Sequence, residues 1–169
     1  MELVRIADVR ATGLYRAARR WILGMRKGSR LHRTLVRERQ IAAEANSFTF
    51  DLTKGTDLLV VDVTARPETS AGELEEAVAR ELDLVVQDGV TSEEVERAVA
   101  LIETDLISAL QSAGERADQL SKYATYFGDP SLINEQADRY RAVTAGQVSA
   151  FARARMREED RASLLYVPK

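Results

Sequence analysis

Apolar and polar positions alternate in several short segments of the chain. Residues 48–52 and 59–63 place apolar side chains at every second position, on either side of the turn sequence TKGTD. Neighbouring side chains of a strand point to opposite faces of a sheet, so this pattern predicts an antiparallel hairpin. Shorter alternations around Gly13 predict one or two strands within residues 2–21, and the closing stretch ASLLYV predicts a last strand.

The segment before the hairpin has the apolar spacing of a helix. Leu31, Leu35 and Val36 fall on one face of a helix that runs from Arg30 to about Gln40, and arginines lie mostly on the other face. Ser29 precedes this helix and is a residue type whose hydroxyl accepts hydrogen bonds from the first free backbone amides. The sequence therefore predicts a basic helix capped by Ser29.

The second part of the chain is mostly helical, and four of its helices begin at recognisable cap sequences. These are Ser70 in SAGE, Thr91 in TSEE, Asp129 followed by Pro130, and Thr144 in TAGQ. Gly89 has the position of a helix C-terminus after the first of them. Gly114 is expected to interrupt the long helix that begins after Thr91.

The elements follow in the order strand, helix, hairpin, several helices and strand. This order predicts an α+β fold, a two-layer sandwich in which helices cover a mostly antiparallel sheet. A chain of 169 residues with 45% hydrophobic residues is long enough for one ordinary core. No internal repeat or low-complexity linker divides it, so we expect a single domain over residues 1–169.

The charge distribution along the chain is uneven. The first 40 residues contain 11 lysines and arginines against three acidic residues, although the whole chain has a net charge of −3. A basic segment of this kind suits phosphates, an acidic protein partner or plain solvation, because the planar guanidinium group offers several donors. No apolar run approaches the ~20 residues of a membrane span, and the start MELVRIADVR lacks the apolar core of a signal peptide. The expected location is cytoplasmic by default, without a membrane association.

Side chains for metal or nucleophilic chemistry are scarce. The chain has no cysteine, and His32 is its single histidine. Zinc sites in proteins normally need two or three imidazoles or thiolates, so no metal site is expected in this chain. No serine stands in a nucleophile elbow and no glycine loop matches a nucleotide fingerprint, so no catalytic residue is expected either. His32 is interpreted as a helix-surface or interface residue, and the paired acids at 75–76, 93–94 and 158–160 as solvated side chains or complements to a helix dipole.

Several motifs, in order, resemble a known family. They are ILGMRKGSRLHRTLVRERQIA, a hairpin, GELEEAVARELDLVVQDGVTSEEVERA, RADQLSKYATYFGDP, RAVTAGQVSAFARARM and a final SLLYVPK. Together they are similar to the C-terminal, non-zinc half-domain of the pitrilysin/insulinase zinc peptidases, and they span nearly the whole chain. The resemblance implies the LuxS/mitochondrial-processing-peptidase-like metallohydrolase fold, used in pairs that enclose a peptide. It also implies a shortened domain with part of its sheet face uncovered, because AARRW runs almost directly into ILG where relatives have another helix.

The resemblance also implies how the site is divided between partners. The active half of such a peptidase carries an inverted zinc motif, H-x-x-E-H, and nothing in this sequence matches it, so zinc is expected in a catalytic partner only. In many relatives the non-zinc half supplies an arginine and a tyrosine that reach the substrate. Arg37 falls on the arginine position, whereas Glu44 stands where the tyrosine is expected. Arg37 is thus the one substrate-binding residue that the resemblance assigns.

These observations lead to one expected function and two alternatives. The expected function is a non-catalytic domain of a zinc metallopeptidase, inactive alone, that pairs with a catalytic half or a homologous domain and helps to enclose a peptide substrate. The first alternative is a structural assembly protein, like the core subunits of respiratory complexes in the same superfamily. The second is a nucleic-acid binder that uses the arginine-rich N-terminal segment. The basic segment lacks interleaved aromatic residues for base stacking and the rest of the chain is acidic, so nucleic acid is the least favoured partner.

Overall fold

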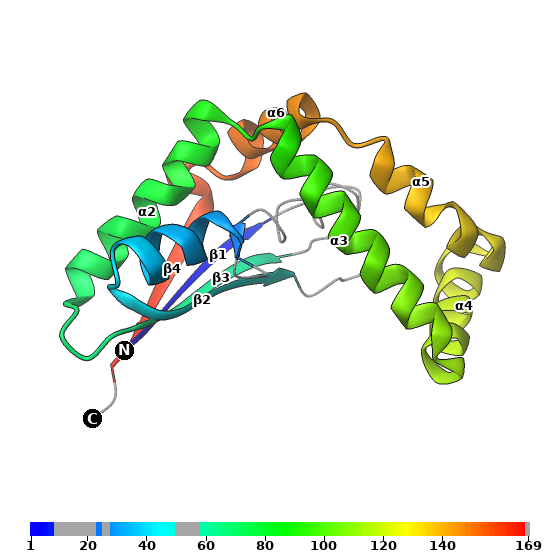
Figure 1. Cartoon of the computed structure of the whole chain (residues 1–169), viewed down its shortest axis with the longest axis horizontal. Coiled ribbons are helices and arrows are strands. Elements are labelled where there is room, and N and C mark those ends of the chain that lie inside the picture. Colours follow the sequence, from blue (N-terminus) through cyan, green and yellow to red (C-terminus); the bar gives the residue numbers. More distant parts are fainter. Residues whose placement is uncertain (9–22, 25–27, 50–57, 168–169) are drawn as a thin grey trace.

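The computed structural model describes residues 1–8, 23–24, 28–49 and 58–167. Within these ranges the elements, in chain order, are β1 (Glu2–Asp8), η1 (His32–Glu38), β2 (Ala42–Thr49), β3 (Leu58–Ala65), α2 (Ala71–Asp88), α3 (Ser92–Gln111), α4 (Ala113–Phe127), η2 (Pro130–Glu135), α5 (Gln136–Arg141), α6 (Ala145–Arg155), η3 (Glu158–Asp160) and β4 (Arg161–Tyr166). The predicted α+β fold is confirmed (Figure 1).

The described strands form one antiparallel sheet in the order β2-β3-β1-β4. Strand β1 lies in the middle and pairs with β3 on one side and with β4 on the other, so the two ends of the chain meet in neighbouring strands. The hairpin of β2 and β3 is confirmed, with one register shift between Ala42 and Glu44. The turn predicted between these strands and the second strand predicted within residues 2–21 lie outside the described residues.

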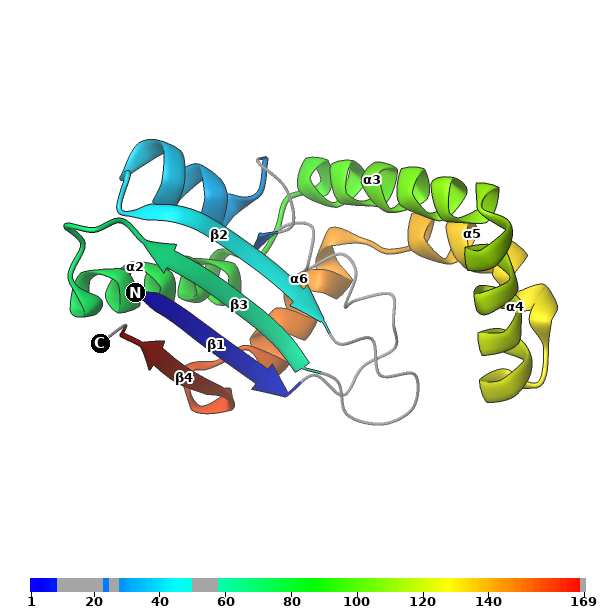
Figure 2. The same cartoon turned by 90° about the horizontal axis from the view of Figure 1, so that it is seen from below.

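Helices cover one face of the sheet. Figure 2 shows α2 and α6 behind the strands and η1 beside β2. One core cluster joins buried side chains of the sheet, η1, α2 and the end of α6, among them Leu3, Val61, Val63, Leu31, Leu35, Leu74, Val78, Leu82, Ala152 and Met156. This burial of apolar side chains between two layers is the main source of stability for the part of the chain that we call the body, namely the sheet with η1, α2 and α6.

A second part of the molecule extends away from the body. Helix α3 leads away from the sheet, and α4, η2 and α5 return along it (Figures 1 and 2). We call residues 104–141 the arm. A separate small cluster at its base contains Val95, Ala98, Ile102, Val143 and Val148. Helix α4, at the far end, has no buried residue at all.

The predicted helix starts are largely confirmed by the cap geometry. Thr91 and Thr144 each form a complete capping box, in which the hydroxyl and the third side chain of the helix exchange hydrogen bonds with backbone amides. Ser70 accepts a hydrogen bond from the amide of Glu73, and Asp129 accepts one from the amide of Ser131. Gly89 follows α2 with a φ of 77°, as the prediction of a helix end at a glycine requires.

Two local predictions are wrong. The hydroxyl of Ser29 is buried, has no hydrogen-bond partner among the described residues and does not cap the first helix, whose turns are widened into the π form over His32–Glu38. The break in the long helix falls at Ser112 instead of Gly114. Ser112 ends α3 and accepts a hydrogen bond from the amide of Glu115, so its side chain starts α4, while Gly114 lies inside that helix. The boundary between α3 and α4 is therefore set by the capping side chain of Ser112 and not by the conformational freedom of Gly114.

The stretch AARRW followed by ILG, on which the expectation of a shortened domain rests, falls mostly outside the described residues. Among the helices that the structure describes, none is long and apolar enough to cross a membrane.

Candidate functional site

The candidate site is built around η1, the helix that carries Arg37. Leu31 and Leu35 are fully buried and fix one side of this helix in the core. The backbone turns are wide, because the amide of Arg39 bonds the carbonyl of Thr34 and the amide of Ile41 bonds that of Leu35. Gln40 then adopts a φ of 56°, and the chain enters β2. A wide turn of this kind is uncommon in helices and is frequent at functional sites.

Arg37 lies in the last turn of η1 and is exposed. A purely structural interpretation of Arg37 is a surface arginine paired with a nearby acid. Its neighbour Glu38 instead lies 3.7 Å from Arg33, and no ion pair joins Arg37 to Glu44 in the described part of the chain. The guanidinium of Arg37 is therefore presented to solvent with its donors available.

Glu44 lies on β2 and is exposed on the sheet face opposite the helices. It pairs across the sheet with Thr64, which in turn pairs with Glu2, and Asp62 lies two positions away on β3. Burial raises the pKa of the Asp62 carboxyl, and the negative charge of Glu2, a hydrogen bond with Glu2 and the charge of Glu44 raise it further. The position where relatives are expected to have tyrosine is thus part of an acidic patch.

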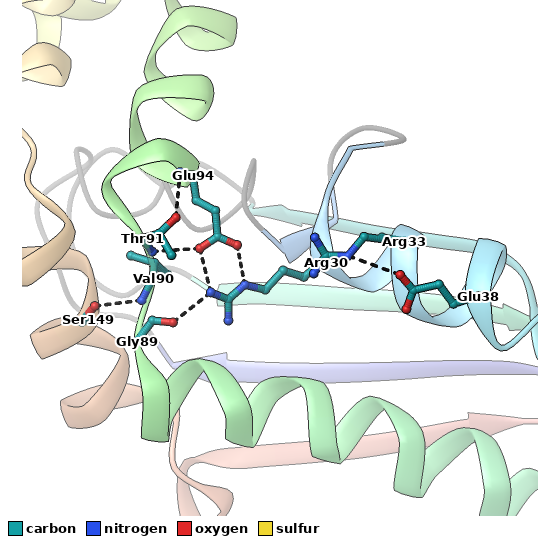
Figure 3. Close-up of polar contacts among 8 residues, drawn as sticks. All are labelled: Arg30, Arg33, Glu38, Gly89, Val90, Thr91, Glu94 and Ser149. Atoms are coloured by element: carbon teal, nitrogen blue, oxygen red, sulfur yellow. Dashed lines mark hydrogen bonds and ion pairs between the residues drawn. The ribbon is translucent and has the colours of Figure 1, made fainter.

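A strong polar junction ties the start of η1 to the turn between α2 and α3 (Figure 3). Arg30 donates from Nε to Glu94 Oε1 at 2.6 Å and from Nη2 to Glu94 Oε2 at 2.7 Å, and Nη2 also donates to the carbonyl oxygen of Gly89 at 3.0 Å. The two side chains are 15% and 12% exposed. Glu94 Oε2 also accepts from the amide of Thr91, so a single carboxylate serves both the ion pair and the capping box.

The pKa values of this pair follow from its geometry. Burial alone would raise the pKa of Glu94, but the hydrogen bonds from Arg30 and from the Thr91 amide, with the charges of Arg30 and Arg97, lower it below its usual value. The hydrogen bond to Glu94 raises the pKa of Arg30 despite its burial. Both groups are charged at neutral pH, and each keeps the other ionised.

Gly89 and Ser149 complete the junction from the side of α6. Ser149 is buried, and its hydroxyl accepts a hydrogen bond from the amide of Val90 at 3.0 Å. A Cβ atom at Gly89 would lie 2.9 Å from Ser149 Cβ and closer still to its hydroxyl oxygen, and the φ of 77° disfavours other residues. Glycine is therefore required here for both its space and its conformation.

A groove of about 760 Å³ runs beside this junction, between η1, α2 and the start of α3. Its lining carries both signs of charge, from Arg30, Arg33, Glu38, Arg39, Glu76, Arg80, Glu81, Asp88, Glu93, Glu94 and Arg97. Arg39 lies 3.6 Å from Glu73, so three of the four arginines in residues 30–39 have an acidic partner. Arg37 is not part of this lining and presents its charge elsewhere.

The donor set of this chain does not fit a zinc site. It offers one imidazole and no thiolate, and the described residues hold no group of three side chains of the types that ligate metals. His32 lies in η1 and is partly buried, and its buried Nδ1 has no hydrogen-bond partner among the described residues.

Sequence reasoning missed the Arg30–Glu94 pair. It placed Arg30 on a solvated basic face and Glu94 among dipole-compensating acids, whereas the two residues, 64 positions apart, form a bidentate contact. The only local signal was the capping box, which fixes the carboxylate of Glu94 near the helix start.

The comparisons with known proteins agree with this architecture. Residues 20–102 match the model of the Peptidase M16 inactive domain. This region of the chain belongs to this family of inactive peptidase domains. The resemblance to the non-zinc half-domain of the pitrilysin/insulinase peptidases, which are the M16 peptidases, is thereby confirmed. No curated protein sequence matches the chain.

Three solved structures show the same fold at low sequence identity. The inactive peptidase domain of a zinc protease candidate from Bordetella parapertussis is 22% identical with a TM-score of 0.86, and the match covers 99% of this chain and 90% of that one. A protease from Helicobacter pylori is 18% identical with a TM-score of 0.83, over 96% of this chain and 40% of that one. A chain of Complex III2 from Candida albicans is 14% identical with a TM-score of 0.72, over 96% and 42%. This M16 domain thus spans about two fifths of each of the two longer chains.

Proposed function

We propose that this M16 domain is the non-catalytic component of a zinc peptidase, pairing with a zinc-bearing half to enclose a peptide. The observation that carries the proposal is the match of residues 20–102 to the inactive domain of this peptidase family, together with a chain whose own donors do not fit zinc. Catalytic zinc then belongs to the partner. The chain alone hydrolyses no peptide.

Within this proposal Arg37 binds the substrate. Its guanidinium is exposed and has no acidic partner among the described residues, whereas Arg30, Arg33 and Arg39 on the same segment are paired with acids. An unpaired guanidinium is free to donate to a peptide carbonyl or carboxylate. Such a hydrogen bond is strengthened in a closed chamber from which water is partly excluded.

The same pairing argues against the nucleic-acid alternative. Phosphate binding needs cations that are free to replace counterions along the backbone. Three of the arginines that line the groove, Arg30, Arg33 and Arg39, pair with acids from α3, η1 and α2, and further acids line it, so the groove presents a mixed field. Any affinity for a generic duplex is expected to be weak and to disappear at moderate salt.

The test is reconstitution with an M16 protein of the same genome that contains H-x-x-E-H. The two purified chains are mixed, and the mixture is examined for a complex by sedimentation and for hydrolysis of a quenched fluorescent peptide library. We expect activity from the complex only, and its loss when the partner's first motif histidine is replaced by alanine. Absence of a complex with every such partner would contradict the proposal.

The role of Arg37 is tested in that complex with a matched control. Arg37→Ala removes an unpaired exposed guanidinium, and Arg33→Ala removes one that pairs with Glu38 on the same helix. We expect Arg37→Ala to lower kcat/KM by about tenfold or more with assembly unchanged, and Arg33→Ala to leave it within about twofold. If both variants had the same kcat/KM, Arg37 would not be a substrate-binding residue.

The structural alternative keeps one specific support, the similarity of fold to a chain of Complex III2. In that case this chain would be a structural subunit of a complex that has no peptidase activity. A stable complex with the partner that hydrolyses no member of the peptide library, with zinc present in the partner, would favour it over the peptidase.

A further inference from the structure

Helix α2 has a charged residue within its buried face. The buried side chains of this helix recur every three or four residues, and they are Leu74, Ala77, Val78, Glu81, Leu82 and Val85. Glu81 is 8% exposed, and a glutamate buried to this extent normally has an ion pair or hydrogen bonds that compensate its charge. In the described part of the chain, no hydrogen bond or ion pair joins the carboxylate of Glu81 to another group. This carboxylate therefore keeps its acceptor positions unused.

Glu81 lines the groove between η1, α2 and the start of α3. Its carboxylate oxygens are not among the described side-chain atoms that are sealed from solvent without a partner, so the groove is where they meet water. The groove volume of about 760 Å³ lies within the roughly 300–1,000 Å³ of ordinary ligand pockets. A ligand in the groove can therefore reach a carboxylate that the fold itself leaves unpaired.

The other weakly exposed charges of the described lining neutralise each other. Arg30 donates from Nε and Nη2 to both oxygens of Glu94, and from Nη2 to the carbonyl oxygen of Gly89. The hydrogen bond to Glu94 is the main reason why the pKa of Arg30 is raised, and the charge of Glu81 adds a smaller contribution. The remaining arginines of the lining are exposed, so water and salt screen their charges. The groove therefore favours a cation beside Glu81.

We propose that this groove binds an arginine side chain of a polypeptide partner, with its guanidinium paired to Glu81. A guanidinium suits the site better than an ammonium group, because its planar fork of donors meets both oxygens of a carboxylate and because it is less strongly hydrated. The neighbouring contact between Arg30 and Glu94 has this bidentate geometry. The inference goes beyond the proposed function, because it needs neither a catalytic partner nor Arg37.

A nuclear magnetic resonance titration of the full, isotope-labelled chain tests the proposal. The probe is the end-blocked pentapeptide Ala-Ala-Arg-Ala-Ala. We expect saturable shifts of the amide signals around Glu81 with a Kd of about 1 mM, because one charge-assisted pair in a partly dehydrated site is the main contact. The same peptide with glutamine in place of arginine should cause no saturable shift. Absence of saturable shifts with the arginine peptide up to about 20 mM would overturn the proposal.

Two matched variants locate the contact. Glu81→Gln removes the buried charge, and Glu76→Gln removes an exposed charge from the same helix and the same groove. We expect Glu81→Gln to raise the Kd of the arginine peptide by about tenfold or more, and Glu76→Gln to change it by less than about twofold. If the two variants raised the Kd equally, the peptide would respond to the general charge of the groove, and the assignment to Glu81 would be wrong.

Thermal denaturation without peptide separates a binding role of Glu81 from a structural one. An unpaired buried charge opposes folding, so we expect the Tm of Glu81→Gln to equal or exceed that of the wild-type chain. A lowered Tm would show that the carboxylate stabilises the fold, and it would overturn the proposal.

A last titration identifies the source of the guanidinium. N-Methylguanidinium carries the head group of arginine without a polypeptide, and we expect it to bind at least about tenfold more weakly than the arginine peptide, because it lacks the apolar stem and the main-chain contacts. Equal affinity would mean that the groove takes a free guanidinium compound, and the assignment of a polypeptide partner would be wrong.

Discussion

The body and the arm use the same kind of helix start but differ in what their helices bury. Helix α2 in the body begins with a serine cap at Ser70 and buries six side chains. Helix α4 in the arm begins with a serine cap at Ser112 and buries none. Caps stabilise a helix end by about 1 kcal/mol, whereas each buried leucine contributes roughly 2 kcal/mol or more. Similar local sequences therefore produce helices whose contributions to the stability of the fold are very different.

The junction at Gly89 connects these two regions. It joins the end of α2 to the start of α3, and it is held by Arg30, just before η1, and by Ser149 in α6. We expect the arm to open at a lower free energy than the body, because local opening follows the density of buried contacts. The following predictions test this difference, beginning with the largest effect.

Gly89→Ala is expected to destabilise the fold by about 4 kcal/mol. The new Cβ would contact Ser149, and alanine disfavours a φ of 77°. Gly72→Ala in α2 and Gly114→Ala in α4 are controls in helices, with open space around both positions, and each should stabilise its helix by up to about 1 kcal/mol. Urea denaturation measures all three. If Gly89→Ala lowered the free energy of unfolding by less than about 1 kcal/mol, the backbone and Ser149 would be able to shift and accommodate the new Cβ atom.

Leu74→Ala and Leu120→Ala compare one leucine from each region. Leu74 in α2 is fully buried, so its truncation should cost about 3 kcal/mol of global stability. Leu120 in α4 is 38% exposed and should cost less than about 1 kcal/mol. Hydrogen exchange should show faster exchange confined to the arm in the second variant. Equal costs would mean that the arm and the body unfold as one unit.

Glu94→Gln is expected to cost about 2 kcal/mol at neutral pH, because it leaves the guanidinium of Arg30 partly buried without its counter-charge. The pKa of Glu94 is lowered in the folded state from an ordinary value of 4.5. Its contribution to stability is therefore complete above about pH 4.5 and is lost as the pH falls through the lowered pKa. Denaturation of both proteins between pH 7 and about pH 3 measures the difference, which should shrink on acidification. A constant difference would assign the effect to packing.

Asp62→Asn is expected to stabilise the body by about 0.5 kcal/mol at neutral pH. The pKa of Asp62 is raised in the folded state from an ordinary value of 3.8, so the ionised carboxylate opposes folding above the raised pKa. The difference from wild type should fall as the pH drops through that value and vanish below about pH 3.8, where the carboxyl is protonated in both states. Thermal denaturation at several pH values checks it. A destabilised variant would show that the Asp62 carboxylate makes a net favourable contact.

Much of the fold could be predicted from the sequence because its signals are local. Threonine with glutamate or glutamine three residues later predicts a capping box, and strict alternation predicts a strand, since both depend on residues adjacent in the chain. The position of Arg37 on an exposed helix turn followed from the same periodicity. Its role in binding a peptide stays a prediction, as does the single-domain assignment.

The rest of the site depended on contacts between distant residues. Arg30 and Glu94 are 64 positions apart, and the acidic patch joins Glu44, Asp62 and Glu2 from three strands. A pattern of residue types states which side chains are polar, but it does not state which of them meet.

The sequence by itself determined the family, the order of the elements and the starts of most helices, because backbone hydrogen bonding at a cap or along a strand is decided by near neighbours. Only the tertiary structure decided the widened turns of η1, the bidentate junction at Glu94 and the place of β1 between β3 and β4 in the sheet. Each of these depends on what a distant segment places beside a backbone group or a charge. Burial and pairing, unlike capping, are properties of two surfaces, and the chain must fold before those surfaces meet.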